Sequence, residues 1–112
     1  VDYPDTARAA CEAILAGRVD RAVIVCGSGA GVAVAACKFP GIRAAVAHDT
    51  YTAHQCVEHD DVNVLCLGAR VIGPALASDC IRSFLGAQFT GEERHARRLA
   101  KIDAIEREFA RT

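Results

Sequence analysis

An apolar run from Ala22 to Cys26 leads directly into a loop that holds three glycines, Gly27, Gly29 and Gly31, and this junction limits the possible folds more than any other segment. The run has the length and the β-branched content that are typical of a buried parallel strand. The small residues from Ala30 to Ala36 indicate a helix behind it. The predicted order is therefore strand, glycine loop and helix, and open α/β folds bind ligands at the carboxyl ends of such strands.

In this arrangement the N–H groups of Gly27 to Gly31 point into one concavity at a helix N-terminus, where partial positive charge favours a phosphate or a developing oxyanion. The same charge favours the thiolate form of a nearby cysteine, and Cys26 stands where the strand gives way to the loop. From this pattern alone, a catalytic and a structural role for Cys26 both stay open. The other five cysteines are interpreted as small hydrophobic core residues: Cys11, Cys37, Cys56, Cys66 and Cys80.

Composition limits the class of protein. The chain has 112 residues, of which 52% are hydrophobic, and this predicts one small domain spanning residues 1–112 with a packed core. Six cysteines without a CxxC pair fit a reducing cytoplasm better than a disulfide scaffold, and no His/Cys spacing predicts a metal site. A net charge of −1 and the lack of a long apolar run argue against nucleic-acid and membrane partners.

Apolar runs alternate with helical segments along the whole chain, which predicts an α/β fold: a Rossmann-like, three-layer α/β/α arrangement with a mainly parallel sheet and a C-terminal helix. We predict three strands, few for a doubly wound sheet, at Arg21–Cys26, Arg43–Ala47 and Asn63–Leu67. We predict helices at Thr6–Ala16, Ala30–Ala36, Thr50–His59 (a helix or a turn), Gly73–Leu85 and Glu92–Arg111.

Several charged residues suit an anionic substrate. His59 is followed by Asp60 on a turn before the third strand. An imidazole can transfer protons near neutral pH, although the local sequence favours a solvated loop as the explanation of this cluster. Arg70 follows the third strand at the edge where ligands bind. Arg94 and Arg98 share one helix face and could converge on a phosphate, or belong to a solvated helix with ion pairs between successive turns.

Binding of a dinucleotide is the main alternative for the glycine loop. The fingerprint GxGxxG is not met, because Val32 occupies the place of the third glycine and Gly31 falls one position early. A phosphate-binding P-loop is excluded as well, because no GK[ST] follows the glycines.

Six blocks of sequence make the chain resemble the type B ribose-5-phosphate isomerases and their relatives, the galactose-6-phosphate and allose-6-phosphate isomerases. The blocks occur in the family's order and are Val1–Asp5, Ile24–Gly31, Ala36–Ala44, Glu58–Leu65, Gly68–Gly73 and Arg94–Arg98.

The resemblance implies a cofactor-free aldose–ketose isomerase of the pentose phosphate pathway, which converts ribose 5-phosphate to ribulose 5-phosphate through a cis-enediolate. Cys26 matches the base that moves a proton between C2 and C1, the loop with Ser28 would hold the enediolate oxygens, and His59 would open the sugar ring. The family is typically homodimeric, with sites at the subunit interface. The positions that match substrate-binding residues are Tyr3, Gly27, Gly29, Ala30, Gly31, Asp60, Arg70, Arg94 and Arg98.

Two departures from the family pattern leave alternatives open. Asp60 stands where an asparagine is common, and an ionised carboxylate cannot donate a hydrogen bond and repels a phosphosugar, so a six-carbon phosphosugar is a second candidate substrate. Family members usually begin with a strand–helix–strand unit, which has no counterpart here. We interpret the chain as a fragment or a shortened relative, and a non-catalytic phosphosugar-binding module is the alternative to an active isomerase.

Overall fold

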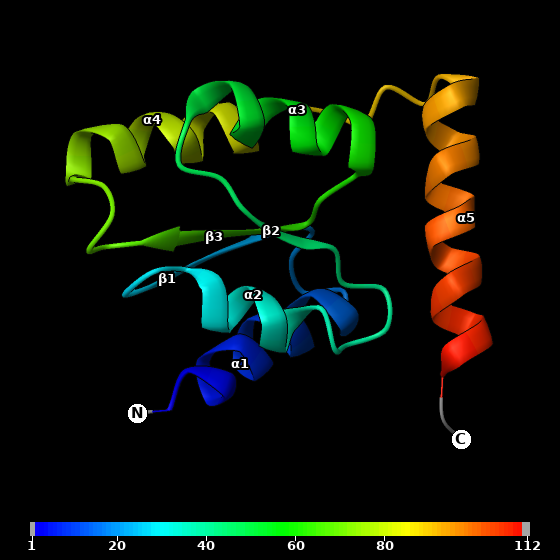
Figure 1. Ribbon diagram of the computed structural model, residues 1–112, viewed down its shortest axis with the longest axis horizontal. Coiled ribbons are helices and arrows are strands. Elements are labelled where there is room, and N and C mark those ends of the chain that lie inside the picture. Colours follow the sequence, from blue (N-terminus) through cyan, green and yellow to red (C-terminus); the bar gives the residue numbers. More distant parts are fainter. Residues whose placement is uncertain (1, 111–112) are drawn as a thin grey trace.

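The structure is a computed structural model that describes residues 2–110, and it places three parallel strands between two pairs of helices (Figure 1). The elements are α1 (Tyr3–Leu15), β1 (Ala22–Cys26), α2 (Ala30–Ala36), β2 (Ala44–Val46), α3 (Thr50–Asp60), β3 (Val64–Gly68), α4 (Pro74–Leu85) and α5 (Glu93–Phe109). The sheet order is β1-β3-β2. The predicted α/β fold with a parallel sheet and a C-terminal helix is confirmed.

The sheet separates two hydrophobic clusters. In Figure 1, α1 and α2 cover one face of the sheet and α3 and α4 the other, while α5 extends along one end. All five residues of β3 are buried. Because side chains alternate along a strand, Val64 and Cys66 pack in the cluster with α1 and α2, and Leu65 and Leu67 pack in the cluster with α3 and α4. The central strand thus joins both halves of the core.

Strand β1 is less buried than its apolar sequence predicts. It pairs only with β3 in the described sheet, so one of its edges has no strand beside it. Ile24 is 3% exposed, whereas the next residue, Val25, is 53% exposed. The expectation that both faces of this strand are covered is therefore wrong for the described chain, because the face that carries Val25 borders a cavity.

Several element boundaries differ from the predicted ones. Helix α1 begins at Tyr3 instead of Thr6, because Pro4 fits the first turn, where a proline's missing N–H costs nothing; Asp2 is the N-cap residue but its side chain forms no capping hydrogen bond. It ends at Leu15, one residue early.

The strands are shorter at their amino ends than predicted. Arg21, Arg43 and Asn63 lie outside them, while Gly68 extends β3 by one residue. Helix α5 begins at Glu93, because Glu92 is its N-cap residue, and Arg111 lies outside the described residues.

Cys37 is not the core residue that its sequence context predicts. It is exposed at the C-cap of α2, and its Sγ lies 3.5 Å from the carbonyl oxygen of Ala44. The helix has only two turns and buries only Val32 and Ala36, so Cys37, the residue after its end, falls off the core face. The other four predicted core cysteines are buried.

Within residues 2–110, no helix combines the length and the apolar character that a membrane span requires.

Candidate functional site

The carboxyl ends of β1 and β3 carry the first half of the predicted site. Cys26 is the last residue of β1, and its Sγ accepts a hydrogen bond from the Gly29 amide at 3.1 Å. The Ser28 hydroxyl oxygen likewise accepts from the Ala30 amide at 3.2 Å. These two amides of the predicted anion cradle therefore already contact the side chains of Cys26 and Ser28. The hydrogen bond from Gly29 fixes the position of the Cys26 sulfur at the carboxyl end of β1.

Glycines are required where the loop meets β3. Gly29 caps α2 with φ 83°, a left-handed conformation that favours glycine, and a Cβ there would lie 3.1 Å from the carbonyl carbon of Leu67. Two backbone bonds complete this contact: the Ala69 amide donates to the Cys26 carbonyl at 2.7 Å, and the Arg70 amide donates to the Gly27 carbonyl at 3.0 Å. The backbone after β3 therefore fixes the loop that carries the thiol.

We expect Gly68→Ala to displace this loop. The new Cβ would lie 2.6 Å from the carbonyl carbon of Ser28 and 2.7 Å from its Cα and oxygen, and these are backbone atoms that cannot rotate away. Overpacking of this kind costs about 2 kcal/mol of unfolding free energy. Chemical denaturation measures the loss. Gly73→Ala is the control, because its Cβ meets no atom within 4 Å and only a cap preference of under about 1 kcal/mol is at stake. Equal stability of the two variants would contradict the contact.

A cavity of about 610 Å³ opens beside the thiol. This volume is in the range of small-molecule sites. The Tyr3 ring forms one wall and packs directly on Gly31, where a Cβ would lie 2.8 Å from Tyr3 Cε1. Arg70 supplies a positive charge. The lining residues are Asp2, Tyr3, Cys26, Gly27, Ser28, Gly31, Arg70 and Val71.

The six cysteines differ in their ability to ionise. Burial raises the pKa of Cys66 to about 12 and that of Cys56 to about 11. Burial also raises the pKa values of Cys11 and Cys80. These four side chains are therefore protonated thiols at neutral pH. Only Cys26 combines access to solvent, a place in a cavity and a hydrogen-bond donor aimed at its sulfur.

His48, which is not among the predicted site residues, also lies at this edge. It follows β2, and its Nε2 accepts a hydrogen bond from the Gly68 amide at 2.8 Å. This nitrogen is therefore already engaged by the backbone of β3. The interaction ties the end of β2 to the end of β3. The sequence feature that indicates a role for His48 is its position in a His-Asp pair soon after a strand.

The second half of the predicted site lies at the opposite edge of the sheet. Helix α3 runs back from the carboxyl end of β2 to the amino end of β3, so His59 and Asp60, in its last turn, lie at the amino edge (Figure 1). Arg94 and Arg98 are in the first turns of α5, at the same end. Five residues of strand span about 13 Å. One chain therefore does not bring His59 and Cys26 together, and His59 is helical and not on the predicted turn.

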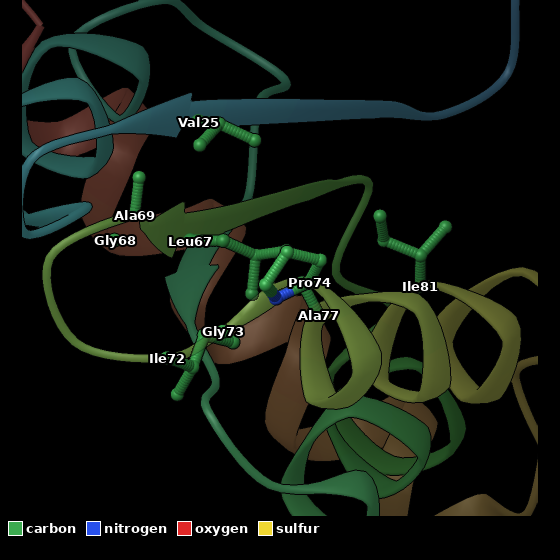
Figure 2. Close-up of a pocket in the computed structure, with 9 residues that line it drawn as sticks. All are labelled: Val25, Leu67, Gly68, Ala69, Ile72, Gly73, Pro74, Ala77 and Ile81. Carbon is green, nitrogen blue, oxygen red and sulfur yellow. The ribbon is translucent and has the colours of Figure 1, made fainter.

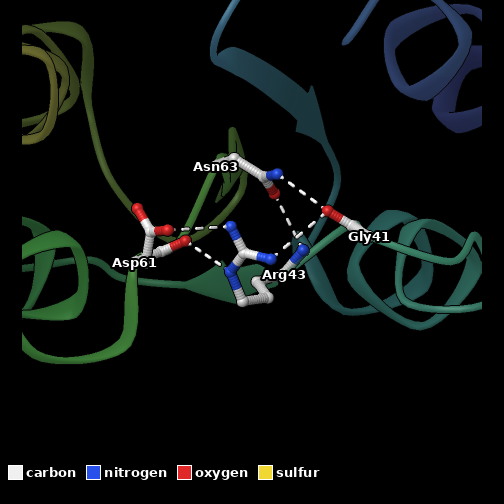
Figure 3. Close-up of polar contacts among 4 residues, drawn as sticks. All are labelled: Gly41, Arg43, Asp61 and Asn63. Carbon is white, nitrogen blue, oxygen red and sulfur yellow. Dashed lines mark hydrogen bonds and ion pairs between the residues drawn. The ribbon is translucent and has the colours of Figure 1, made fainter. Parts of the chain in front are cut away.

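A polar network fixes the backbone directly after His59. Asp61 ends α3 in the left-handed conformation, with φ 49°. Arg43 Nε donates to the Asp61 carbonyl at 2.6 Å, and Arg43 Nη2 donates to Asp61 Oδ2 at 3.1 Å. Asn63 Nδ2 donates to the Gly41 carbonyl at 3.0 Å, and Asn63 Oδ1 accepts from the Arg43 amide at 2.8 Å (Figure 3). Arg43, just before β2, therefore holds the end of α3, and Asn63, just before β3, holds the backbone at Gly41 and Arg43.

The cationic residues of α5 divide into paired and unpaired ones. Arg97 Nη1 donates to Glu93 at 3.1 Å, one helical turn away, and Arg94 Nη2 lies 3.5 Å from Glu92 Oε2. These contacts fit the solvated-helix alternative. Arg98 forms no ion pair with any residue between positions 2 and 110, so its guanidinium is available to an anion.

A second cavity, of about 220 Å³, lies between β1 and α4 (Figure 2). Its lining residues have only apolar side chains or none: Val25, Leu67, Gly68, Ala69, Ile72, Gly73, Pro74, Ala77 and Ile81. No charged group is present to bind a phosphate, so this cavity does not fit the predicted substrate. It does explain why Val25 is exposed.

Comparisons with known proteins identify the family and agree with the fold. The family described as Ribose/Galactose Isomerase matches residues 1–102. Ribose-5-phosphate isomerase B of Escherichia coli is 44% identical over 94% of this chain and 70% of the relative. D-erythrulose-4-phosphate isomerase 2 of Mycolicibacterium smegmatis is 42% identical over 93% of this chain and 68% of the relative. A solved ribose-5-phosphate isomerase B from Clostridium thermocellum has a TM-score of 0.94 at 46% identity, covering 98% of this chain and 74% of that chain.

Proposed function

The chain belongs to the ribose/galactose isomerase family, and from that premise we propose that it interconverts ribose 5-phosphate and ribulose 5-phosphate, in the pentose phosphate pathway of the cytoplasm. The observation that carries this proposal is the placement of Cys26. Its sulfur accepts the Gly29 amide at the mouth of a cavity that also presents Ser28 and Arg70. A base, hydrogen-bonding groups for an oxyanion and a cation are the parts that isomerisation of an anionic sugar needs.

The proton transfer follows from this placement. The Cys26 thiolate takes the proton from C2 of the open-chain aldose, the C1–C2 double bond forms, and the electron pair of the carbonyl moves to O1. The thiol then returns the proton to C1. The hydroxyl on C2 loses its proton and becomes the ketone, while O1 takes up a proton. The Ser28 hydroxyl and the loop amides stabilise the enediolate oxygens, whose charge develops during the reaction.

Ring opening and phosphate binding need the other half of the site. Opening the cyclic sugar moves a proton from the anomeric hydroxyl to the ring oxygen, which an imidazole can do near neutral pH. Because His59, Asp60, Arg94 and Arg98 lie at the opposite edge of the sheet from Cys26, we place them in the site of a second copy. A homodimer with two such composite sites satisfies this geometry. In a twofold interface, the amino edge of each chain can meet the carboxyl edge of the other, so the same contact occurs twice.

Turnover of ribose 5-phosphate to ribulose 5-phosphate by this chain tests the proposal. We expect catalysis of this pair to exceed that of six-carbon aldose phosphates. Calorimetry with a phosphorylated hydroxamate that mimics the enediolate should show tighter binding than ribose 5-phosphate, because a catalytic site is complementary to the transition state. Faster turnover of a six-carbon substrate would overturn the substrate assignment. Binding without any turnover would identify a non-catalytic phosphosugar-binding module instead.

A further inference from the structure

We propose that His95 is a positioning residue, which holds the imidazole of His59 in the orientation that ring opening requires. This inference rests on the proposed function, in which His59 opens the sugar ring. It concerns a residue 36 positions further along the chain, on a different helix.

The two imidazoles are stacked. Their ring centroids are 4.1 Å apart and their planes differ by 27°. His95 is 2% exposed and is the one buried residue of α5, whereas His59 is half-buried. Stacked rings at this distance attract one another and restrict rotation of the side chain. His95 therefore covers one side of the His59 ring, and the exposed part of His59 stays open to a ligand.

The position of His95 is itself fixed by Thr90. The Thr90 hydroxyl oxygen lies 2.6 Å from His95 Nδ1 and accepts the Glu92 amide at 3.2 Å. The Thr90 amide donates to the Glu58 carbonyl at 3.1 Å, and Glu58 directly precedes His59 in α3. A closed circuit of contacts thus joins the His95 ring, the loop before α5 and the backbone next to His59. Such a circuit places a side chain more accurately than a single contact does.

The charges around His95 favour its neutral form. Burial lowers the pKa of His95, the neighbouring His59 lowers it further, and Arg94 and Arg98 act in the same direction, while Glu92 opposes them. A neutral ring does not repel His59 when His59 holds the proton that it gives to the sugar. His95 can therefore stay stacked on His59 both when His59 holds the proton and after His59 has given it to the sugar.

Two aldose phosphates separate positioning from general stability. Ribose 5-phosphate must open its ring, whereas erythrose 4-phosphate cannot close one, because its C4 oxygen carries the phosphate. We expect His59→Asn to lower kcat/KM for ribose 5-phosphate by about a hundredfold and for erythrose 4-phosphate much less. His95→Ala should show the same selectivity at about tenfold, since a misplaced acid loses only part of its effect. His95→Phe keeps a stacking ring and should restore most of the loss.

Control measurements make each result decisive. His54→Ala is the control, because His54 lies in α3 with His59 but contacts Ser83 and Glu58 and does not stack on His59. This variant should leave the ratio of the two activities unchanged.

In proton NMR, His95→Ala should shift the Cε1 proton of His59 downfield by removing a ring current, and His95→Phe should not. Equal losses on both substrates in His95→Ala, or an unmoved His59 resonance, would overturn the inference. Equal losses in His59→Asn would instead overturn the ring-opening role of His59 in the proposed function.

Discussion

Replacing Cys26 with alanine should lower kcat for ribose 5-phosphate by about a thousandfold and leave phosphosugar binding nearly unchanged. The Cys26 sulfur lines the cavity and is held there by the Gly29 amide, which lies 3.1 Å away. The alanine side chain cannot accept a proton, while Ser28 and Arg70 still line the cavity. A thousandfold loss corresponds to about 4 kcal/mol of transition-state stabilisation. Steady-state kinetics and calorimetry with ribose 5-phosphate measure the two effects separately.

Cys37→Ala is the matched control for this variant. Cys37 is the other accessible cysteine, but it lies at the C-cap of α2, where its sulfur contacts the carbonyl oxygen of Ala44. The alanine variant should keep full activity. Loss of binding together with turnover in Cys26→Ala would show that the thiol contributes to binding and not to proton transfer. Retained turnover would assign the base to another group.

The sequence predicted the order of the elements because local patterns decide it. The β-branched run before the glycine loop, the proline at the start of α4 and the charged C-terminal segment each have a short-range cause, and all three predictions are confirmed. Burial was predicted less well. The burial of Cys37 and of Val25 depends on which parts of the fold cover them. A sequence window of a few residues does not contain that information.

The two-part arrangement of the candidate site had a signal in the sequence. His59 precedes a strand whereas Cys26 ends one, and in a parallel sheet these two positions lie at opposite edges. Side-chain chemistry alone does not show that the two groups are apart, whereas the interface sites that the family resemblance implies allow them to come from two chains. The stacking of His95 on His59 had no such signal, since it depends on how the loop around Thr90 returns α5 to the end of α3.

Mixing two inactive variants should restore activity if the halves of the site come from two chains. In a mixture of Cys26→Ala and His59→Asn, half of the dimers are mixed, and each mixed dimer has one site with an intact thiol and an intact imidazole. We therefore expect about a quarter of the wild-type activity on ribose 5-phosphate from the mixture, and about half from the purified mixed dimer. The chains carry different affinity tags and are co-expressed, so that the mixed dimer can be purified and its turnover compared with that of each parent.

The matched control pairs Cys26→Ala with a chain that carries both substitutions, because no site in that mixture has a thiol. It should stay as inactive as its parents, which excludes recovery through simple stabilisation of the dimer. Mixed dimers that form without any recovery would show that one chain supplies the complete site. His59 would then have to move across the sheet, past the buried residues of β3 and away from the network that Arg43 and Asp61 form at the end of α3. A second copy meets the same requirement without breaking any of these contacts.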